Sequence, residues 1–124
     1  MNDWGEFVFS KPYEGTTIDK VNNVVLPLQY IDFMKQHNGG EGDIGETWLI
    51  LFPIDELQEI NEEYCIEEFL PNHIIIGSNG SGELYGIDAD GEYFNVPALI
   101  EEEYVVLLGD DIHDLPYRIN ELWK

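Results

Sequence analysis

The glycine-rich segment at residues 77–82, Gly-Ser-Asn-Gly-Ser-Gly, is the first place where residue types and spacing could do chemistry. Such loops bind phosphate when a helix N-terminus stands behind them and, in the Walker form, when a lysine precedes a serine or threonine. Here the loop runs into residues 83–88, where apolar and polar residues alternate as in a strand, and no lysine is near. The pattern favours a connection between two strands over a nucleotide site.

Two further patterns resemble ion-binding sites. Residues 88–91, Asp-Ala-Asp-Gly, look like the middle of a calcium loop of the EF-hand type. With Gly91 at the sixth position, the first and twelfth ligands would be Gly86 and Pro97, and neither side chain provides a carboxylate. A weak divalent-ion site among clustered carboxylates remains an alternative. Zinc has little support, because no ligand-spaced cysteines accompany the three widely separated histidines His37, His73 and His113.

The candidate nucleophiles are also weak. Cys65 is the only cysteine and lies in a predicted helical stretch rich in glutamate, where neighbouring anions keep a thiol protonated. We therefore expect a buried, structural cysteine. Carboxylates are so numerous that no pair can be singled out as acid and base, and no nucleophile-elbow context surrounds the serines Ser10, Ser78 and Ser81. We expect no catalytic residue, no cofactor and no metal, and so no enzyme.

The carboxylates do form two dense clusters. One is predicted to share a helical face at spacings i,i+4 and i,i+5, and the other precedes a predicted strand that leads to a further pair of aspartates. Like charges at i,i+4 destabilise a helix by about 0.2–0.5 kcal/mol. A solvated surface explains either cluster alone, whereas an anionic binding surface explains both. The candidate partner-binding residues are Glu62, Glu63, Glu67, Glu68, Glu101, Glu102, Glu103, Asp110 and Asp111.

The distribution of charge along the chain supports a binding surface. The 124 residues contain 26 Asp and Glu but only 5 Lys and Arg, for a net charge of −21, and no Lys or Arg lies between Lys35 and Arg118. Such an excess costs stability through self-repulsion, so it needs a reason: solubility, a saline environment, or steering toward a basic protein partner. Phosphate and anionic lipid would be repelled. We therefore expect neither nucleic acid nor membrane as a partner.

Composition predicts one folded domain over residues 1–124. The chain is 44% hydrophobic and 13% aromatic, which is too apolar for a disordered acidic tail. No apolar run approaches the roughly 20 residues that span a bilayer. The start of the chain lacks a secretory signal, and a single cysteine cannot form an internal disulfide. We expect a cytoplasmic protein.

The predicted elements indicate an α+β domain. Residues 4–25 suggest a short strand, a loop and an irregular lead-in. Helices are predicted at residues 28–37, 57–64 and within 110–124. Asp55 is predicted to cap the second helix, which is followed by a further turn to residue 70. Residues 42–46 are predicted to form a loop. Strands are predicted at 48–52, 73–77, 83–88, 92–96 and 104–108. Strands grouped by hairpins indicate a mainly antiparallel sheet flanked by helices.

Two ordered motifs extend this prediction. Residues 26–40 read LPLQYIDFMKQHNGG, and residues 74–82 read IIIGSNGSG, followed by YGID and the turn Asp90-Gly91. In this order they resemble the helix, strand, glycine loop and hairpin of the SUKH superfamily, the Smi/Knr-type domains, over about residues 26–108. Both ends depart from that pattern: residues 4–25 replace the usual first helix, and the closing helix lacks a Ser-Phe-x-x-Phe-Leu motif.

The resemblance implies an α+β fold and a protein-binding role. Bacterial members of the family act as immunity proteins that neutralise toxins, often nucleases, and fungal members regulate cell-wall synthesis as interaction hubs. Together with the charge, this gives the hypothesis of a non-catalytic immunity protein with a basic toxin domain as its partner. The alternatives are a regulatory interaction module and a metal-dependent hydrolase. If acidity serves only solubility, the interface is expected among exposed aromatics such as Trp4, Tyr13 or Tyr85.

Overall fold

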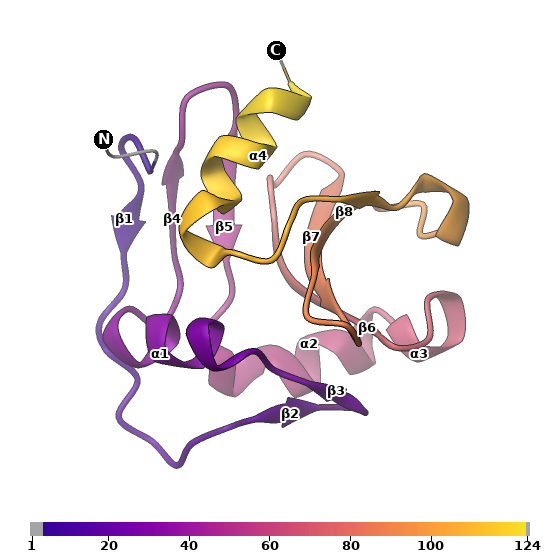
Figure 1. Cartoon of the computed structure of the whole chain (residues 1–124), viewed down its shortest axis with the longest axis horizontal. Helices are drawn as coiled ribbons and strands as arrows, with labels where there is room; N and C mark the ends of the chain where they lie inside the picture. The colour runs from indigo at the N-terminus through magenta and orange to yellow at the C-terminus, as the bar shows by residue number, and fades with distance from the viewer. Residues whose placement is uncertain (1–3, 124) are drawn as a thin grey trace.

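A computed structural model describes residues 4–123, in which a seven-stranded antiparallel sheet has the order β1-β4-β5-β6-β7-β8-β9 and β2-β3 form a separate hairpin (Figure 1). The strands are β1 (Val8–Phe9), β2 (Lys20–Val21), β3 (Val24–Val25), β4 (Gly40–Asp43), β5 (Trp48–Leu51), β6 (His73–Ser78), β7 (Glu83–Asp88), β8 (Tyr93–Pro97) and β9 (Val106–Leu107). The helices are α1 (Leu28–Gln36), α2 (Leu57–Glu63), α3 (Ile66–Phe69) and α4 (Leu115–Leu122), with 3₁₀ turns η1 (Ile54–Glu56), η2 (Glu102–Tyr104) and η3 (Ile112–Asp114). The predicted α+β class is confirmed.

The sheet has two apolar faces, because successive side chains of a strand point to opposite sides. One face packs against α1 and α4 and forms the larger core, which includes Tyr30, Leu49 and Ile119. The other face is covered by α3 and the segment after β8, and its smaller core contains Ile66, Leu70, Ile75, Leu84, Phe94 and Val96. This second cover reaches only β6, β7 and β8. Over β1, β4 and β5 the second face stays open, and Val8 there is 70% exposed.

The side chain of Asn61 takes the place of a strand beside β6. Strand β5 pairs with β6 only through Ile50–Ser78 and Leu51–Gly77, so the first half of β6 lacks a strand neighbour on that side. Asn61 is buried on α2; its Oδ1 accepts the amide hydrogen of Ile75 at 2.7 Å, and its Nδ2 donates to the Ile75 carbonyl at 2.9 Å. These bonds satisfy a β6 edge that would otherwise be buried without partners. They fix α2 to the sheet.

Strand β4 corrects the predicted loop at Gly42 and Asp43, whereas residues 44–46 lie outside any helix or strand, as predicted. Gly40 and Gly42 lie in this strand, although glycine is depleted in strands. A Cβ on Gly42 would lie 2.7 Å from the carbonyl oxygen of Glu6, because the backbone of the β1 region passes directly over it. The glycines are therefore required by close approach of two chains. Glycine is typical of turns, so the composition of this segment indicated a loop. In the structure the same glycines are needed because a side chain would collide with the neighbouring backbone.

Two smaller predictions also change. The irregular lead-in contains the hairpin of β2 and β3, in which Asn22 takes a positive φ of 53°. Asp55 does not cap α2: it lies inside η1, and its carboxylate accepts a hydrogen bond from the Asn38 side chain at 2.9 Å. Asn38 also accepts the Ile54 amide hydrogen at 2.7 Å, so this pair ties the end of α1 to the start of the second helical region.

The glycine-rich loop at 77–82 joins β6 to β7, as predicted. The Asn79 side chain accepts the amide hydrogens of Ser81 and Glu83 at 2.8 and 3.1 Å, and Gly80 and Gly82 take φ values of +75° and +103°. No helix N-terminus follows the loop, because its continuation is strand β7. Its geometry is that of a hairpin turn.

Valine at position 80 or 82 should therefore lower the free energy of unfolding by about 1 kcal/mol or more, because a β-branched residue is strained at positive φ. Chemical denaturation measures this, with Ser81→Val as the control because Ser81 is exposed and has no positive φ. ATP or GTP should give no binding heat with the wild-type chain. Saturable nucleotide binding, or unchanged stability of both glycine variants, would contradict a purely structural loop.

Candidate functional site

The first acidic cluster lies on two helices, not on one helical face as predicted. Cys65 adopts a left-handed conformation, with φ 54° and ψ 41°, which ends one helix before the next begins. Glu62 and Glu63 therefore lie at the C-terminal end of α2, and Glu67 and Glu68 lie in the first turn of α3. Negative charge at a helix C-terminus is unfavourable. Cys65 itself is exposed, so the expectation of a buried cysteine was wrong.

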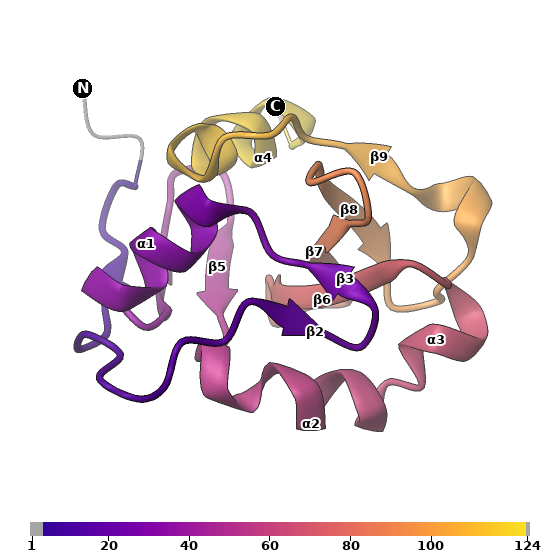
Figure 2. The same ribbon diagram turned by 60° about the horizontal axis from the view of Figure 1, so that its bottom comes forward.

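Members of both glutamate clusters border a single hollow between α3 and the segment that follows β8. Figure 2 shows the two segments side by side. The hollow has a volume of about 580 Å³ and is lined by Glu63, Tyr64, Phe69, Ala98, Leu99, Ile100, Glu101 and Glu102. Glu62, Glu67, Glu68 and Glu103 are their sequence neighbours, and all seven glutamates are exposed. We call this hollow the acid-walled groove.

Large apolar side chains lie open to solvent in the acid-walled groove. Phe69 is 54% exposed and Leu99 is 68% exposed. Their backbone is nevertheless anchored, because Ile66 and Leu70 on either side of Phe69 are buried in the smaller core and Ile100 packs against that core. An exposed apolar patch with a polar rim is typical of a protein-binding site. The groove combines such a patch with walls of one charge.

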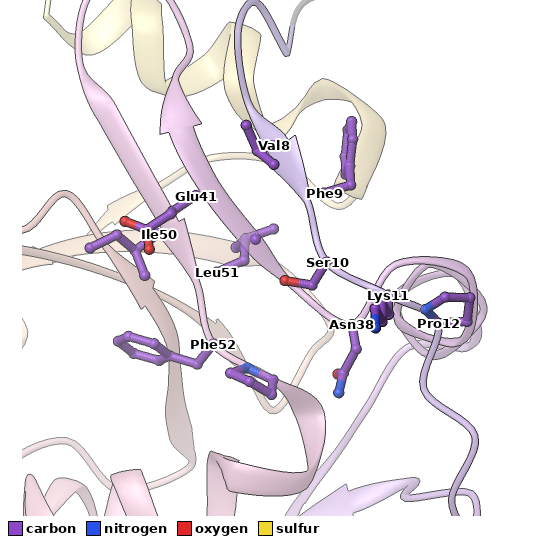
Figure 3. A pocket seen from close by; sticks show the side chains of 12 residues that line it. Val8, Phe9, Ser10, Lys11, Pro12, Asn38, Glu41, Ile50, Leu51 and Phe52 are labelled. Atoms are coloured by element: carbon purple, nitrogen blue, oxygen red, sulfur yellow. The ribbon is translucent and has the colours of Figure 1, made fainter.

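The groove continues along α2. A second hollow of about 360 Å³ adjoins it and shares Glu63 and Tyr64, adding Phe52 and Ile60. Phe52 in turn lines a third hollow of about 750 Å³ at the open half of the sheet, and Val8, Ile50, Ser10 and Lys11 are also among its lining residues (Figure 3). The three hollows are therefore connected through the lining residues that they share. Most of their glutamates lie at the α3 end.

No lysine or arginine lines the acid-walled groove or the adjoining hollow within the described residues. The lysines and the arginine of residues 4–123 lie elsewhere: Lys20 is on β2, Lys35 is on α1, Arg118 is on α4, and Lys11 lines the third hollow beside β1. Of the seven glutamates in the two clusters, all of which lie in the described residues, only Glu62 has a side-chain hydrogen bond, which it accepts from Gln58 at 3.0 Å. The negative charge of the groove is therefore not neutralised within this part of the chain.

Asp110 and Asp111 lie apart from the groove, between β9 and η3. The Asp111 carboxylate accepts the amide hydrogen of His113 at 2.8 Å and so caps η3. Burial, together with the charges of Asp111 and Asp110, raises the pKa of Tyr93 above its ordinary value. This part of the predicted surface has a structural function of its own, and the structure does not bring it together with the seven glutamates.

Two of the aromatic residues expected to be exposed are buried. Trp4 and Tyr85 belong to the larger core, and Tyr13 is half-buried. The exposed aromatic side chains of residues 4–123 are instead Trp48, Phe69, Tyr104, Tyr117 and Trp123. Phe69 is the one that lines the groove. Within the same residues, no three His, Cys, Asp or Glu side chains are grouped to hold a metal ion, and no helix has the length and apolarity to cross a membrane.

The fold is that of an α+β domain, and its family supports a role in protein interaction. The chain belongs to the SMI1 / KNR4 family (SUKH-1), whose model matches residues 17–115, and the predicted resemblance is thereby confirmed. It is also similar to an acetylglutamate kinase of Carboxydothermus hydrogenoformans, with 33% identity over 70 residues. That match covers 53% of this chain and 24% of the kinase, so the chain spans about a quarter of that relative.

Proposed function

We propose that this chain is a non-catalytic, cytoplasmic immunity protein that binds and neutralises a basic toxin domain. The observation that carries the proposal is the acid-walled groove, in which two glutamate clusters far apart in sequence border one exposed apolar hollow without a cation in its walls. Family membership supports a protein-binding role. The alternative is a regulatory interaction module of the Smi/Knr type, which would use the same groove on a partner that is not a toxin.

Electrostatics favours a basic partner of the nuclease kind. A nuclease presents Lys and Arg to phosphate, so an acidic inhibitor can occupy that surface and associate with it rapidly. Nucleic acid itself would be repelled by a chain of net charge −21. A phosphotransferase role like that named for the kinase relative has no support in the 77–82 loop, which lacks both a lysine and a following helix.

The partner can be captured from native cells with the wild-type chain, in parallel with a variant whose seven groove glutamates are changed to glutamine. The expected partner is basic, is retained only by the wild-type chain, and is toxic when it is expressed alone. Co-expression of the wild-type chain should restore growth, and the glutamine variant should not. A captured partner that is harmless alone would support the regulatory module instead.

Association kinetics with the captured partner test the role of charge. Raising salt from about 50 to about 500 mM should lower kon by about tenfold and change koff less, because screening removes long-range attraction. Reversal to lysine at Glu101, Glu102 and Glu103 should slow association similarly. The matched control reverses three exposed carboxylates outside the groove, Glu14, Asp19 and Asp32. Equal effects of the two sets would mean that only total charge matters.

A further inference from the structure

We infer that the acid-walled groove takes an amphipathic helix of its partner, with an apolar stripe seated on Phe69 and Leu99 and cationic side chains on both flanks. The inference rests on the proposed basic partner and specifies the shape and chemistry of the segment that the partner inserts. It starts from the arrangement of charge across the groove.

Both walls of the groove carry glutamates as well as apolar residues. One wall is formed by α2 and α3, with Glu63 at the lining and three more glutamates beside it; the other wall carries Glu101 and Glu102. The same two walls contribute the apolar lining, with Tyr64 and Phe69 on the α2–α3 side and Leu99 and Ile100 on the other. A partner that fits both walls must present apolar groups to the hollow and cations to the glutamates on either side of it.

A helix can present that pattern better than an extended strand can. On a helix, residues at i, i+3, i+4 and i+7 form one apolar stripe, and the positions beside the stripe point to its left and right. On a strand, successive side chains point to opposite faces, so cations that alternate with apolar residues would point away from the groove. The two acidic walls therefore select a helix with flanking Lys or Arg.

The apolar lining continues beyond the acid-walled groove, so a helix can be engaged along its length. Ile60 and Tyr64 are four residues apart on the α2 side, and with Phe52 they extend the lining into the adjoining hollow. Glu63 lines both hollows, so negative charge accompanies the apolar lining from one to the next. A second copy of this chain is a poor occupant, because its own excess of carboxylates would be repelled.

Three synthetic peptides of about 18 residues, about five helical turns, provide the probe. The first places leucines in one stripe flanked by lysines. The second has the same composition, with the leucines distributed all round, and the third replaces each lysine of the first with glutamate. We expect the first peptide to become helical on binding and to bind about tenfold more tightly than the second, because it alone places apolar anchors in the groove. The glutamate peptide should not bind.

Variants of the groove locate the site. Phe69→Ser and Leu99→Ser should each remove most of the advantage of the striped peptide, mainly by raising koff. Leu28→Ser is the matched control, since Leu28 is 80% exposed on α1 and lies outside the groove. All three residues are exposed, so melting temperatures should stay close to that of the wild-type chain.

The remaining outcomes separate this inference from the proposed function. Equal, salt-sensitive binding of the two lysine peptides would overturn the helix-in-groove inference while leaving a basic partner in place. The same conclusion would follow if Leu28→Ser weakened the striped peptide as much as Phe69→Ser did. Failure of both lysine peptides to bind better than the glutamate peptide would overturn the inference and also count against a basic partner.

Discussion

Replacing Asn61 with alanine should lower the free energy of unfolding by about 3 kcal/mol or more, because the amide and carbonyl of Ile75 would be left buried and unpaired. The two groups now bond to the Asn61 side chain at 2.7 and 2.9 Å. Asn61→Leu should be nearly as unstable, since leucine fills a similar volume without making either bond. Urea denaturation of the two variants measures both changes.

Glu59→Ala serves as the control, because Glu59 is exposed on the same helix and should change stability by less than about 0.5 kcal/mol. The helix carries Glu62 and Glu63, so loss of the Asn61 bonds should also loosen one wall of the acid-walled groove and weaken partner binding. If Asn61→Leu were as stable as the wild-type chain, the edge of β6 would not need this side chain. The account of how α2 is held would then be wrong.

The protein should lose stability as the pH rises above about 10, with three tyrosines responsible. Burial raises the pKa of Tyr30, Tyr85 and Tyr93 above the ordinary 10.0, and the effect on Tyr85 is partly offset by Trp123. An unfolded tyrosine loses its proton near that pH while the folded one keeps it. The stability is therefore complete below pH 10 and declines as the pH rises toward the folded pKa, by about 1.4 kcal/mol per pH unit for each tyrosine.

Denaturation series at neutral and alkaline pH measure this loss, and tyrosinate absorbance follows ionisation. The ionisation of three of the seven tyrosines should coincide with unfolding. Tyr30→Phe and Tyr93→Phe are informative because, within the described residues, neither hydroxyl has a hydrogen-bond partner. Each change should preserve stability near neutral pH and flatten the alkaline decline. Ionisation of all seven tyrosines before any loss of structure would contradict the prediction.

The fold class and the second half of the sheet could be predicted from local patterns. The β-branched run before Gly77 and the Asp90-Gly91 turn specify strands and a hairpin directly. Strand β4 could not be predicted, since its glycines are explained only by the neighbouring chain. The left-handed conformation of Cys65 was also missed, because at a residue other than glycine it is imposed by tertiary structure.

The candidate site was predictable in its charge but not in its shape. The sequence identifies both glutamate clusters, yet only the fold brings Glu63 and Glu101 to the same hollow. Phe69 and Leu99 were missed because an apolar residue in a helix or before a strand gives no sign of whether it is exposed. Asn61 was missed for a related reason, since a single asparagine in a helix gives no indication that it bonds to a distant strand.

The exposed position of Cys65 between α2 and α3 makes the groove accessible to chemical labelling. It is the only sulfhydryl in the chain, and it directly follows Tyr64, which lines the groove. A maleimide-linked fluorophore or spin label would therefore attach at one point beside the acidic walls and respond when a partner arrives, with no engineered residue. Amine-directed cross-linkers have no lysine to modify between Lys35 and Arg118, so a thiol- or carboxyl-directed reagent is the appropriate means of trapping the complex.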